Sequence, residues 1–221
     1  MRRVLAALAV LLLVPAAPAA AAPRIDAMLE DSEVNYGEAH QITGTLRDGT
    51  APLAGQQVVL QGRRYPYLGA VKELQRVVTD AAGRFRFRVK LDRNWRLSVT
   101  APLQDARTPE LDAYTFPAFR LSFRAGSNGV LELTQRYRVP KDVRLREPTL
   151  FYLGPLRARR STLRLRAATT RVARGRYIAT ARARLPAAWH GRFRYGSCFK
   201  PTPGSGMGNA RATCPKRLRF T

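Results

Sequence analysis

RFRFRVKL, residues 84–91, alternates basic and apolar side chains along its whole length. Successive side chains of a β-strand point to opposite faces, so the pattern places Phe85, Phe87 and Val89 on one face and the basic side chains on the other. We therefore predict a strand here that buries one face in a hydrophobic core and turns the other toward solvent.

The sequence around this stretch repeats the pattern in short runs separated by Gly, Pro, Asn and Asp. Such punctuation is typical of strands joined by turns. The predicted strands are residues 25–30, 39–47, 56–63, 71–79, 84–91, 95–100 and 111–116. Because no segment between residues 23 and 117 has helical periodicity, the spacing predicts an antiparallel β-sandwich.

Two segments of this region carry a family resemblance, GTLRDGTAPLAGQQVVL (44–60) and TDAAGRFRF (79–87). Over residues 39–100 the chain resembles the secreted immunoglobulin-like (Ig-like) or carboxypeptidase-regulatory-like (prealbumin-type) β-sandwich modules of bacteria. The matching positions are Gly44, Pro52, Leu53, Gly55, Val58, Leu60, Thr79, Asp80, Gly83, Phe85 and Phe87. Within them, Asp80 and Gly83 are predicted to close a tight hairpin before a core-facing Phe. The resemblance implies a sandwich fold and a spacer or presentation role without catalysis. RRYPYLGAVKE (63–73) departs from the family pattern and leaves a binding contribution open.

The second half of the chain also consists of short alternating runs separated by turn residues. FRLSFRAGSNGVLELTQRYRV (119–139) contains two alternating strands around Asn128-Gly129, a strong hairpin signal. Its inward set would be Phe119, Leu121 and Phe123, facing Leu131, Leu133, Tyr137 and Val139. Further strands are predicted at 149–153, 162–168, 175–184, 192–199 and 216–220. With a boundary at Pro117 and Ala118, we predict an all-β protein of two tandem antiparallel Ig-like β-sandwich domains, residues 23–117 and 118–221.

The first 22 residues, MRRVLAALAVLLLVPAAPAAAA, contain two arginines, an apolar run from Val4 to Val14 and an alanine-rich stretch. These are the three parts of a secretory signal peptide, and the apolar run is shorter than a bilayer span requires. The alternative is a retained N-terminal anchor. We expect residues 1–22 to be a signal peptide and the protein to be secreted or held in the cell envelope.

The net charge of +24 is distributed unevenly. Residues 23–117 have 13 basic and 12 acidic side chains, a net +1, whereas residues 118–221 have 24 and 3, a net +21. Arginine outnumbers lysine 34 to 5, a ratio that a GC-rich genome also tends to produce. Genome composition does not explain the difference between the halves. An anionic partner for the second half therefore stays open beside the compositional explanation.

The two cysteines, Cys198 and Cys214, flank a loop rich in Pro, Gly and small residues. A structural zinc site would need about four Cys or His ligands, and the only histidines are His40 and His190. A thioredoxin-like redox motif would need a much closer pair. An exported chain with an even number of cysteines favours a Cys198–Cys214 disulfide. Within the loop, residues 204–208 remain a candidate recognition loop.

Catalytic patterns are sparse. His190 precedes Ser197, but the G-x-S-x-G elbow is absent and the second half holds only Glu132, Asp142 and Glu147 as carboxylates. EDSE, residues 30–33, lacks the glycine-punctuated spacing of a calcium loop and indicates a solvated turn. We therefore expect no enzyme activity, no metal and no cofactor. The alternative is a secreted hydrolase or inhibitor with a site in the loops of the second domain, at His190.

Basic and aromatic residues alternate in FRLSFR, RYRV, RGRY and RFRY. In strands this spacing sends the rings to the core, as for Phe193 and Tyr195, and covers the outer surface with arginine but no exposed ring. Such a surface suits phosphate or carboxylate polymers better than base stacking. The candidate binding residues, provided that their strands share a sheet, are Arg164, Arg166, Arg176, Arg182, Arg184, Arg192 and Arg194.

These observations lead to one main hypothesis and its alternatives. We expect a non-enzymatic envelope protein whose basic second domain associates with an anionic cell-envelope polymer or membrane surface, the first domain acting as spacer. Binding of extracellular nucleic acid is a less favoured alternative. The sequence sets neither the specific ligand nor an oligomeric state.

Overall fold

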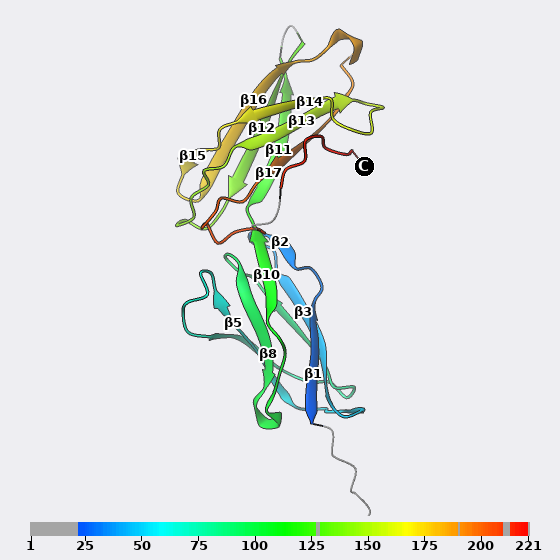
Figure 1. The fold of residues 1–221 in the computed structure, drawn as a ribbon, viewed down its shortest axis with the longest axis vertical. Coiled ribbons are helices and arrows are strands. Elements are labelled where there is room, and N and C mark those ends of the chain that lie inside the picture. Colours follow the sequence, from blue (N-terminus) through cyan, green and yellow to red (C-terminus); the bar gives the residue numbers. More distant parts are fainter. Residues whose placement is uncertain (1–21, 127–128, 190, 210–212, 221) are drawn as a thin grey trace, which may run out of the picture.

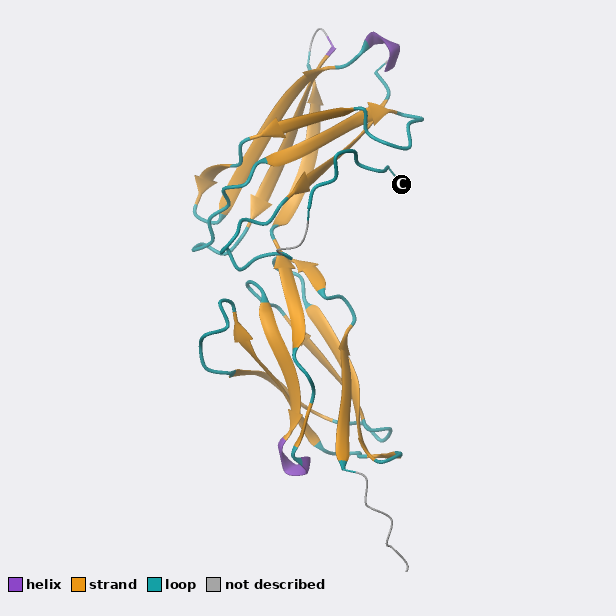
Figure 2. Cartoon of the chain, in the orientation of Figure 1, coloured by secondary structure: helices purple, strands orange, loops and turns teal. Residues whose placement is uncertain are grey.

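A computed structural model describes residues 22–126, 129–189, 191–209 and 213–220. The fold is all-β, and helical structure in this part of the chain is limited to single 3-10 turns such as η1 (Pro102–Gln104) and η3 (Ala187–Trp189) (Figure 2). The described residues include no helix long and apolar enough to cross a membrane. The predicted signal peptide lies outside them, apart from Ala22.

The N-terminal half, residues 22–117, contains two sheets (Figure 1). In the first sheet, β3 (His40–Asp48) pairs with β1 (Pro23–Leu29), β4 (Ala51–Pro52) and β7 (Arg84–Val89). The second runs in the order β2 (Glu33–Asn35), β10 (Leu111–Phe116), β8 (Trp95–Ala101), β5 (Gln57–Arg64) and β6 (Lys72–Val78), with β9 (Ala106–Arg107) beside β8. The pairs are antiparallel except for the parallel pair β2–β10.

The seven strands predicted in this half are all present, as β1, β3, β5, β6, β7, β8 and β10. The sequence did not indicate β2, β4 and β9, because strands of two or three residues are too short to show alternation. In β7, Phe85, Phe87 and Val89 are at most 9% exposed while Arg84 and its alternate neighbours face solvent, as predicted. Residues of both sheets form one hydrophobic cluster around Phe87, Ile42 and Leu97.

Asp80 to Gly83 form the turn that leads into β7. The Asp80 carboxylate accepts the backbone N–H groups of Ala82 and Arg84 at 2.9 and 2.8 Å, and Gly83 has φ +69°. The predicted turn residues are therefore confirmed. The predicted tight hairpin is wrong, because β6 and β7 belong to different sheets and this turn crosses between them.

The C-terminal half, residues 118–220, also contains two antiparallel sheets. The first runs in the order β11 (Ala118–Ala125), β12 (Val130–Arg138), β16 (Arg176–Arg184) and β15 (Thr170–Ala173). The second runs β14 (Leu163–Ala167), β13 (Thr149–Pro155) and β17 (Phe193–Phe199). The hairpin β11–β12 is at the predicted place, although Asn128 itself lies outside the described residues. Strand β15 was not predicted.

A second hydrophobic cluster lies between these two sheets. It contains Leu131, Leu133 and Tyr137 of β12 and Phe151 and Leu153 of β13. The predicted inward residues of β12 are thus buried, but their partners on β11 are not, since Phe119 is 57% and Phe123 48% exposed. Tyr195 is 36% exposed as well. The prediction of a surface without exposed rings is therefore wrong, because β11 and β17 are edge strands whose inner faces are only partly covered.

Residues 213–220 were predicted to include a strand at 216–220, and this prediction is wrong. The only β pairing of this described segment is an isolated bridge between Arg160 and Arg219. It lies against the outer side of the β14-β13-β17 sheet, where glycines leave room: a Cβ on Gly196 would lie 2.3 Å from Leu218. The segment therefore covers part of a sheet face that the sequence had left to solvent.

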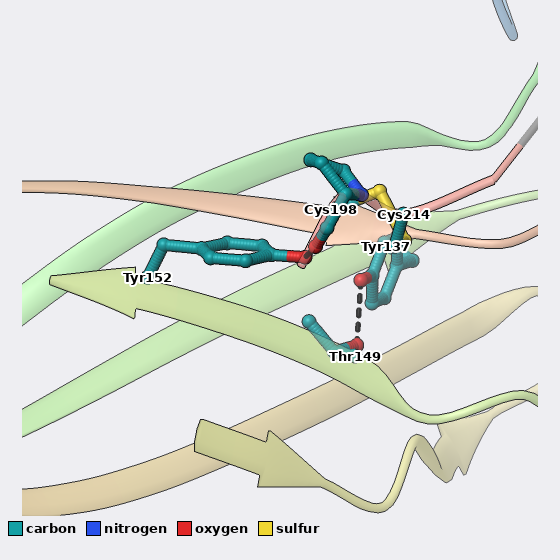
Figure 3. The surroundings of a disulfide bond; sticks show 6 residues. Tyr137, Thr149, Tyr152, Cys198 and Cys214 are labelled. Atoms are coloured by element: carbon teal, nitrogen blue, oxygen red, sulfur yellow. Dashed lines mark hydrogen bonds between the residues drawn. A yellow bond between two sulfur atoms is a disulfide. The ribbon is translucent and has the colours of Figure 1, made fainter. Parts of the chain in front are cut away.

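The Cys198–Cys214 disulfide predicted from the sequence is present, with Cα atoms 5.6 Å apart (Figure 3). It ties the C-terminal segment to β17. Tyr152 beneath the segment is fully buried, and its hydroxyl donates to the carbonyl of Pro215 at 2.6 Å. On the core side the hydroxyls of Tyr137 and Thr149 lie 2.6 Å apart, and burial raises the pKa of Tyr137 well above its ordinary value. The disulfide therefore has the structural role of a cross-link that holds the C-terminal segment to β17.

The loop closed by the disulfide also contacts the N-terminal half. Asn94 donates its backbone N–H to the carbonyl of Gly206 at 2.7 Å and its side-chain amide to that of Gly208 at 2.8 Å. The N–H of Gly208 donates to Thr115 at 2.8 Å. The guanidinium of Arg93 adds an ion pair with Asp142 at 2.5 Å. The glycines that were candidates for a recognition loop therefore join the two halves of this chain.

Candidate anion-binding surface

The outer face of the β11-β12-β16-β15 sheet presents arginines in rows across its strands. On β12, Tyr137 faces the core while Arg136 and Arg138 face solvent. The register places Arg120 of β11 opposite Arg136, and Arg176 of β16 opposite Arg138. Opposed residues of antiparallel strands have Cβ atoms about 4.5–5.5 Å apart. Two pairs of arginines therefore leave the sheet from neighbouring points on one face.

These four arginines line a surface hollow of about 510 Å³, which we call the arginine hollow. Ala118, Ile178 and Val172 lie among them and supply apolar surface. Val172 is 62% exposed and lies where β15 shifts its register, between Arg171 and Ala173. The described lining includes no aspartate or glutamate. The arginine hollow thus combines four positive charges with an apolar floor.

The charges of the arginine hollow are not compensated within the part of the chain that the structure describes. The guanidinium groups of Arg120, Arg136, Arg138 and Arg176 make no hydrogen bond or ion pair there. Like charges at directly opposed strand positions destabilise a sheet. Guanidinium groups bind phosphate and carboxylate groups through paired hydrogen bonds. A bound anion would therefore remove a repulsion that the protein alone leaves in place.

Further along the same face the charges are partly balanced. Glu132 of β12 lies opposite both Arg124 of β11 and Arg182 of β16. Its carboxylate accepts from the Nε of Arg182 at 2.8 Å. Arg184, at the end of β16, lies opposite Val130. The face therefore has a partly neutralised region around Glu132 and an uncompensated region at the arginine hollow.

The seven arginines predicted to bind do not share one sheet. Arg176, Arg182 and Arg184 lie on β16 in the face just described, and of these only Arg176 lines the arginine hollow. Arg164 and Arg166 lie on β14 in the other sheet, and Arg194 lies on β17 next to Arg192. The condition attached to the prediction is therefore not met, and its residues divide between two faces.

The second group flanks a smaller hollow. Arg164 and Arg166 line about 300 Å³ together with Lys200, Leu150 and Cys214, but Glu147 lies there too. Arg164 also interacts with the buried Tyr152, whose pKa burial raises against the opposing effect of Arg164. This hollow contains its own carboxylate and is the weaker candidate for an anion site.

Sequence reasoning missed Arg120, Arg136 and Arg138. They belong to the hairpin recognised at Asn128-Gly129, whose alternation already places all three on one outer face, but the pairing of Arg120 with Arg136 follows only from the observed register. The pairing of Arg138 with Arg176 depends on which later strand lies beside β12, and sequence does not give that neighbour. Part of the site was therefore within reach of pattern analysis, and part required the sheet order.

The other chemical candidates give no site among the described residues. His190, on which the hydrolase alternative depends, lies outside the described residues. His40 is buried, with its two ring nitrogens 3.4 Å from the carbonyl of Asp31 and the hydroxyl of Thr115. Burial lowers the pKa of His40 despite the opposing effect of Asp31. In the described ranges no three His, Cys, Asp or Glu side chains gather as a metal site.

Comparisons with known proteins add little. No protein-family model matches the chain, and no curated protein matches it. Among solved structures, a mutant of Salmonella alpha-2-macroglobulin aligns with 80% of this chain at 16% identity and a TM-score of 0.34. The native conformation of E. coli alpha-2-macroglobulin aligns with 81% of it at 14% identity and a TM-score of 0.34. The aligned region is 12% of either macroglobulin chain, and similarity at this level supports no inference about function.

Proposed function

We propose that this chain is a secreted, non-enzymatic binding protein of two tandem Ig-like β-sandwich domains, residues 23–117 and 118–221. The second domain binds an anionic cell-envelope polymer or lipid head groups. The single observation that carries this proposal is the arginine hollow, where Arg120, Arg136, Arg138 and Arg176 meet without a carboxylate.

The domain arrangement is supported by the two hydrophobic clusters. Each half has a pair of sheets and its own cluster, and strand β10 of the first ends at Phe116 where β11 of the second begins at Ala118. Secretion is supported by the apolar N-terminal sequence and by the Cys198–Cys214 disulfide, since disulfides persist mainly in oxidising compartments.

The spacing of the arginines favours a polymer with repeated anionic groups. Residues two apart along a strand are about 6.6–6.8 Å apart, so the pairs Arg120–Arg136 and Arg138–Arg176 form successive rows at that separation. Successive phosphates or carboxylates of one polymer reach both rows. The near-neutral first domain adds little attraction and acts as a spacer or a separate contact module.

The test compares two variants with equal loss of charge. One carries Arg120→Gln, Arg136→Gln, Arg138→Gln and Arg176→Gln in the arginine hollow. The control carries Arg157→Gln, Arg159→Gln, Arg217→Gln and Arg219→Gln, four exposed arginines away from that face. Binding of the full chain to cell-wall extract, anionic vesicles and duplex DNA is titrated with salt.

We expect the hollow variant to lose at least tenfold in affinity for the polymer that the protein recognises, and the control to lose less than threefold. On DNA each lost phosphate contact lowers the slope of log affinity against log salt by about 0.9. Equal losses in both variants would show that net charge alone drives binding. The proposal would be refuted by an affinity that does not change with salt concentration, or by the absence of binding to cell-wall extract, anionic vesicles and DNA alike.

A further inference from the structure

The outer edge of β11 is available for strand pairing. In its sheet β11 pairs only with β12, and the backbone of residues 118–125 makes no other hydrogen bond to any described part of the chain. An edge strand with unpaired N–H and C=O groups is a template for another strand. We call this row of free backbone groups the β11 edge.

The side chains beneath the β11 edge are apolar and incompletely covered. Phe119, Leu121 and Phe123 face inward, in register with Tyr137, Gln135 and Leu133. Those three partners are at most 2% exposed, whereas Phe119 and Phe123 are 57% and 48% exposed. Across the opening, β17 brings the ring of Tyr195 to 5.1 Å from that of Phe123. The inner side of the β11 edge therefore has room for further apolar side chains.

Gln135 gives an independent sign that something is missing from this opening. It is 2% exposed, and its side-chain oxygen Oε1 has no hydrogen-bond partner in the described part of the chain. Together with Phe119, Ser197 and Phe199 it lines a cavity of about 270 Å³ beneath the β11 edge. A buried oxygen without a donor costs free energy that a donor entering the cavity would recover.

The side chains on the outer side of the β11 edge determine which charge a pairing strand can carry. Arg120 and Arg124 project from this side, with Ser122 between them. A second copy pairing antiparallel through β11 would bring its own arginines against them, and directly opposed like charges are unfavourable. Acidic side chains at the same positions would be favourable. Glu33 is among the residues that line the cavity, so an acidic side chain entering it would meet a like charge, and the acidic positions belong beside the arginines.

We propose that the β11 edge binds an extended acidic segment of a partner protein, which adds an antiparallel strand to the sheet. Six residues of this strand lie opposite β11, counted from position 124 down to position 119. In that order they are acidic, apolar, small and polar, tyrosine, acidic and apolar, and the tyrosine points inward. The tyrosine lies opposite Leu121, the register partner of Gln135, and is long enough to bring its hydroxyl to Oε1 across the intervening strand. Strand addition of this kind gains affinity from backbone hydrogen bonds and specificity from alternate side chains.

The experiment uses three blocked, fluorescently labelled hexapeptides and the full chain: EVTYEV, the scrambled VEVETY, and EVTFEV, which lacks the hydroxyl. Fluorescence anisotropy measures affinity. We expect EVTYEV to bind at least tenfold more tightly than the scrambled peptide, which has the same charge. We expect a threefold or greater loss with EVTFEV, and in a Gln135→Leu protein no difference between EVTYEV and EVTFEV.

Two variants locate the site. Phe123→Ser should weaken EVTYEV binding at least tenfold, whereas Val172→Ser, an exposed valine on the opposite edge strand β15, should change it less than twofold. Arg124→Glu should weaken EVTYEV and restore binding of KVTYEV, whose first residue lies opposite position 124. This rescue is independent of any fold damage from Phe123→Ser.

The outcomes separate this proposal from polymer binding at the arginine hollow. Phe123→Ser should leave polymer binding unchanged, and Arg138→Gln with Arg176→Gln should leave EVTYEV binding unchanged. Equal affinity for the scrambled peptide would reduce the effect to charge attraction and overturn the proposal. Sedimentation showing a dimer that Phe123→Ser dissociates would identify a second copy as the occupant and overturn it as well.

Discussion

In the N-terminal half most arginines lie beside carboxylates, whereas among the described residues of the C-terminal half most do not. Arg24 pairs with Asp26 at 2.6 Å, Arg76 with Glu73 at 2.9 Å and Arg96 with Asp112 at 3.5 Å. Among the described residues of the C-terminal half, the corresponding pair is Arg182 with Glu132. Asp142 is directed to Arg93 of the other half, which lowers the pKa of Asp142.

Strands β7 and β16 allow the two halves to be compared strand by strand. Both alternate arginine with buried residues, so both form strands with one face outward. On β7, Arg86 lies 3.9 Å from Glu30 and donates to Gln41. On β16, Arg176 has no such partner among the described residues. Each strand also contains the other kind of arginine, since the side chains of Arg84 and Arg88 on β7 make no ion pair with any described residue whereas Arg182 of β16 pairs with Glu132. The alternation therefore decides the strand in each case, and the neighbouring strands decide which arginine has a carboxylate beside it.

This comparison bears on the compositional explanation for the arginines. A genome that favours arginine codons raises arginine in both halves of one chain. The N-terminal half contains nearly equal numbers of acidic and basic residues, and its sheets pair them; the C-terminal half does not. The difference between the halves, and not the arginine content itself, is the evidence that needs a functional explanation.

The largest effect that distinguishes the halves should come from the disulfide. Replacing Cys198 and Cys214 by Ser removes a cross-link between residues 16 apart, which should lower the free energy of unfolding of the C-terminal half by about 3 kcal/mol. The N-terminal half should keep its stability, because its hydrophobic cluster contains no residue of the loop.

Tryptophan fluorescence during urea unfolding measures this effect, since the two tryptophans, Trp95 and Trp189, lie one in each half. Trp189→Phe and Trp95→Phe proteins report the N-terminal and C-terminal halves separately. Equal shifts of both transitions would contradict two independent domains and show one cooperative unit, joined through Asn94 and Gly206.

A smaller effect should come from pH and belong to the N-terminal half. Burial lowers the pKa of His40 below its ordinary value near 6.5, so the folded state excludes a proton that the unfolded state binds. Stability is therefore greatest above that value and falls as the pH drops below it. Between pH 7 and pH 6 the loss is at most about 0.7 kcal/mol.

Urea unfolding of the Trp189→Phe protein at pH 7.0, 6.5 and 6.0 measures this loss. The range lies above the titration of ordinary carboxylates. His40→Gln should remove the dependence in the N-terminal half. A His40→Gln protein that keeps the slope would assign it to another group.

The sequence predicted the strands better than their neighbours. Alternation located β7, β12 and β16, because burial of every second side chain leaves a direct trace in the sequence. It did not show that β6 and β7 lie in different sheets, since a turn such as Asp80–Gly83 serves both a hairpin and a crossover. It also gave residues 216–220 a strand, because a segment that covers a sheet has the same composition as one that extends it.

The sequence identified only part of the candidate site, because it does not specify which strands are neighbours. Arg176 was named, while Arg120 and Arg138 were not, because a binding surface depends on which strands are adjacent and sequence alternation specifies only which face each residue takes. The exposed Phe119 and Phe123 were expected in the core. Whether an inward residue is buried depends on its strand being central or an edge, and that property belongs to the sheet.

The smallest expected effect addresses the comparison itself. Arg136→Gln removes one of two opposed arginines in a sheet, so at low salt it should stabilise the C-terminal half by a few tenths of a kcal/mol. Arg86→Gln removes a compensated arginine from β7 and should destabilise the N-terminal half or leave it unchanged. Both effects should shrink in high salt, because screening weakens repulsion and attraction alike. Thermal unfolding of the two single-tryptophan proteins at low and high salt measures the signs. If Arg136→Gln destabilised its half as Arg86→Gln does, the arginines of the hollow would already have partners in the folded protein, and the reason to expect an anion there would be lost.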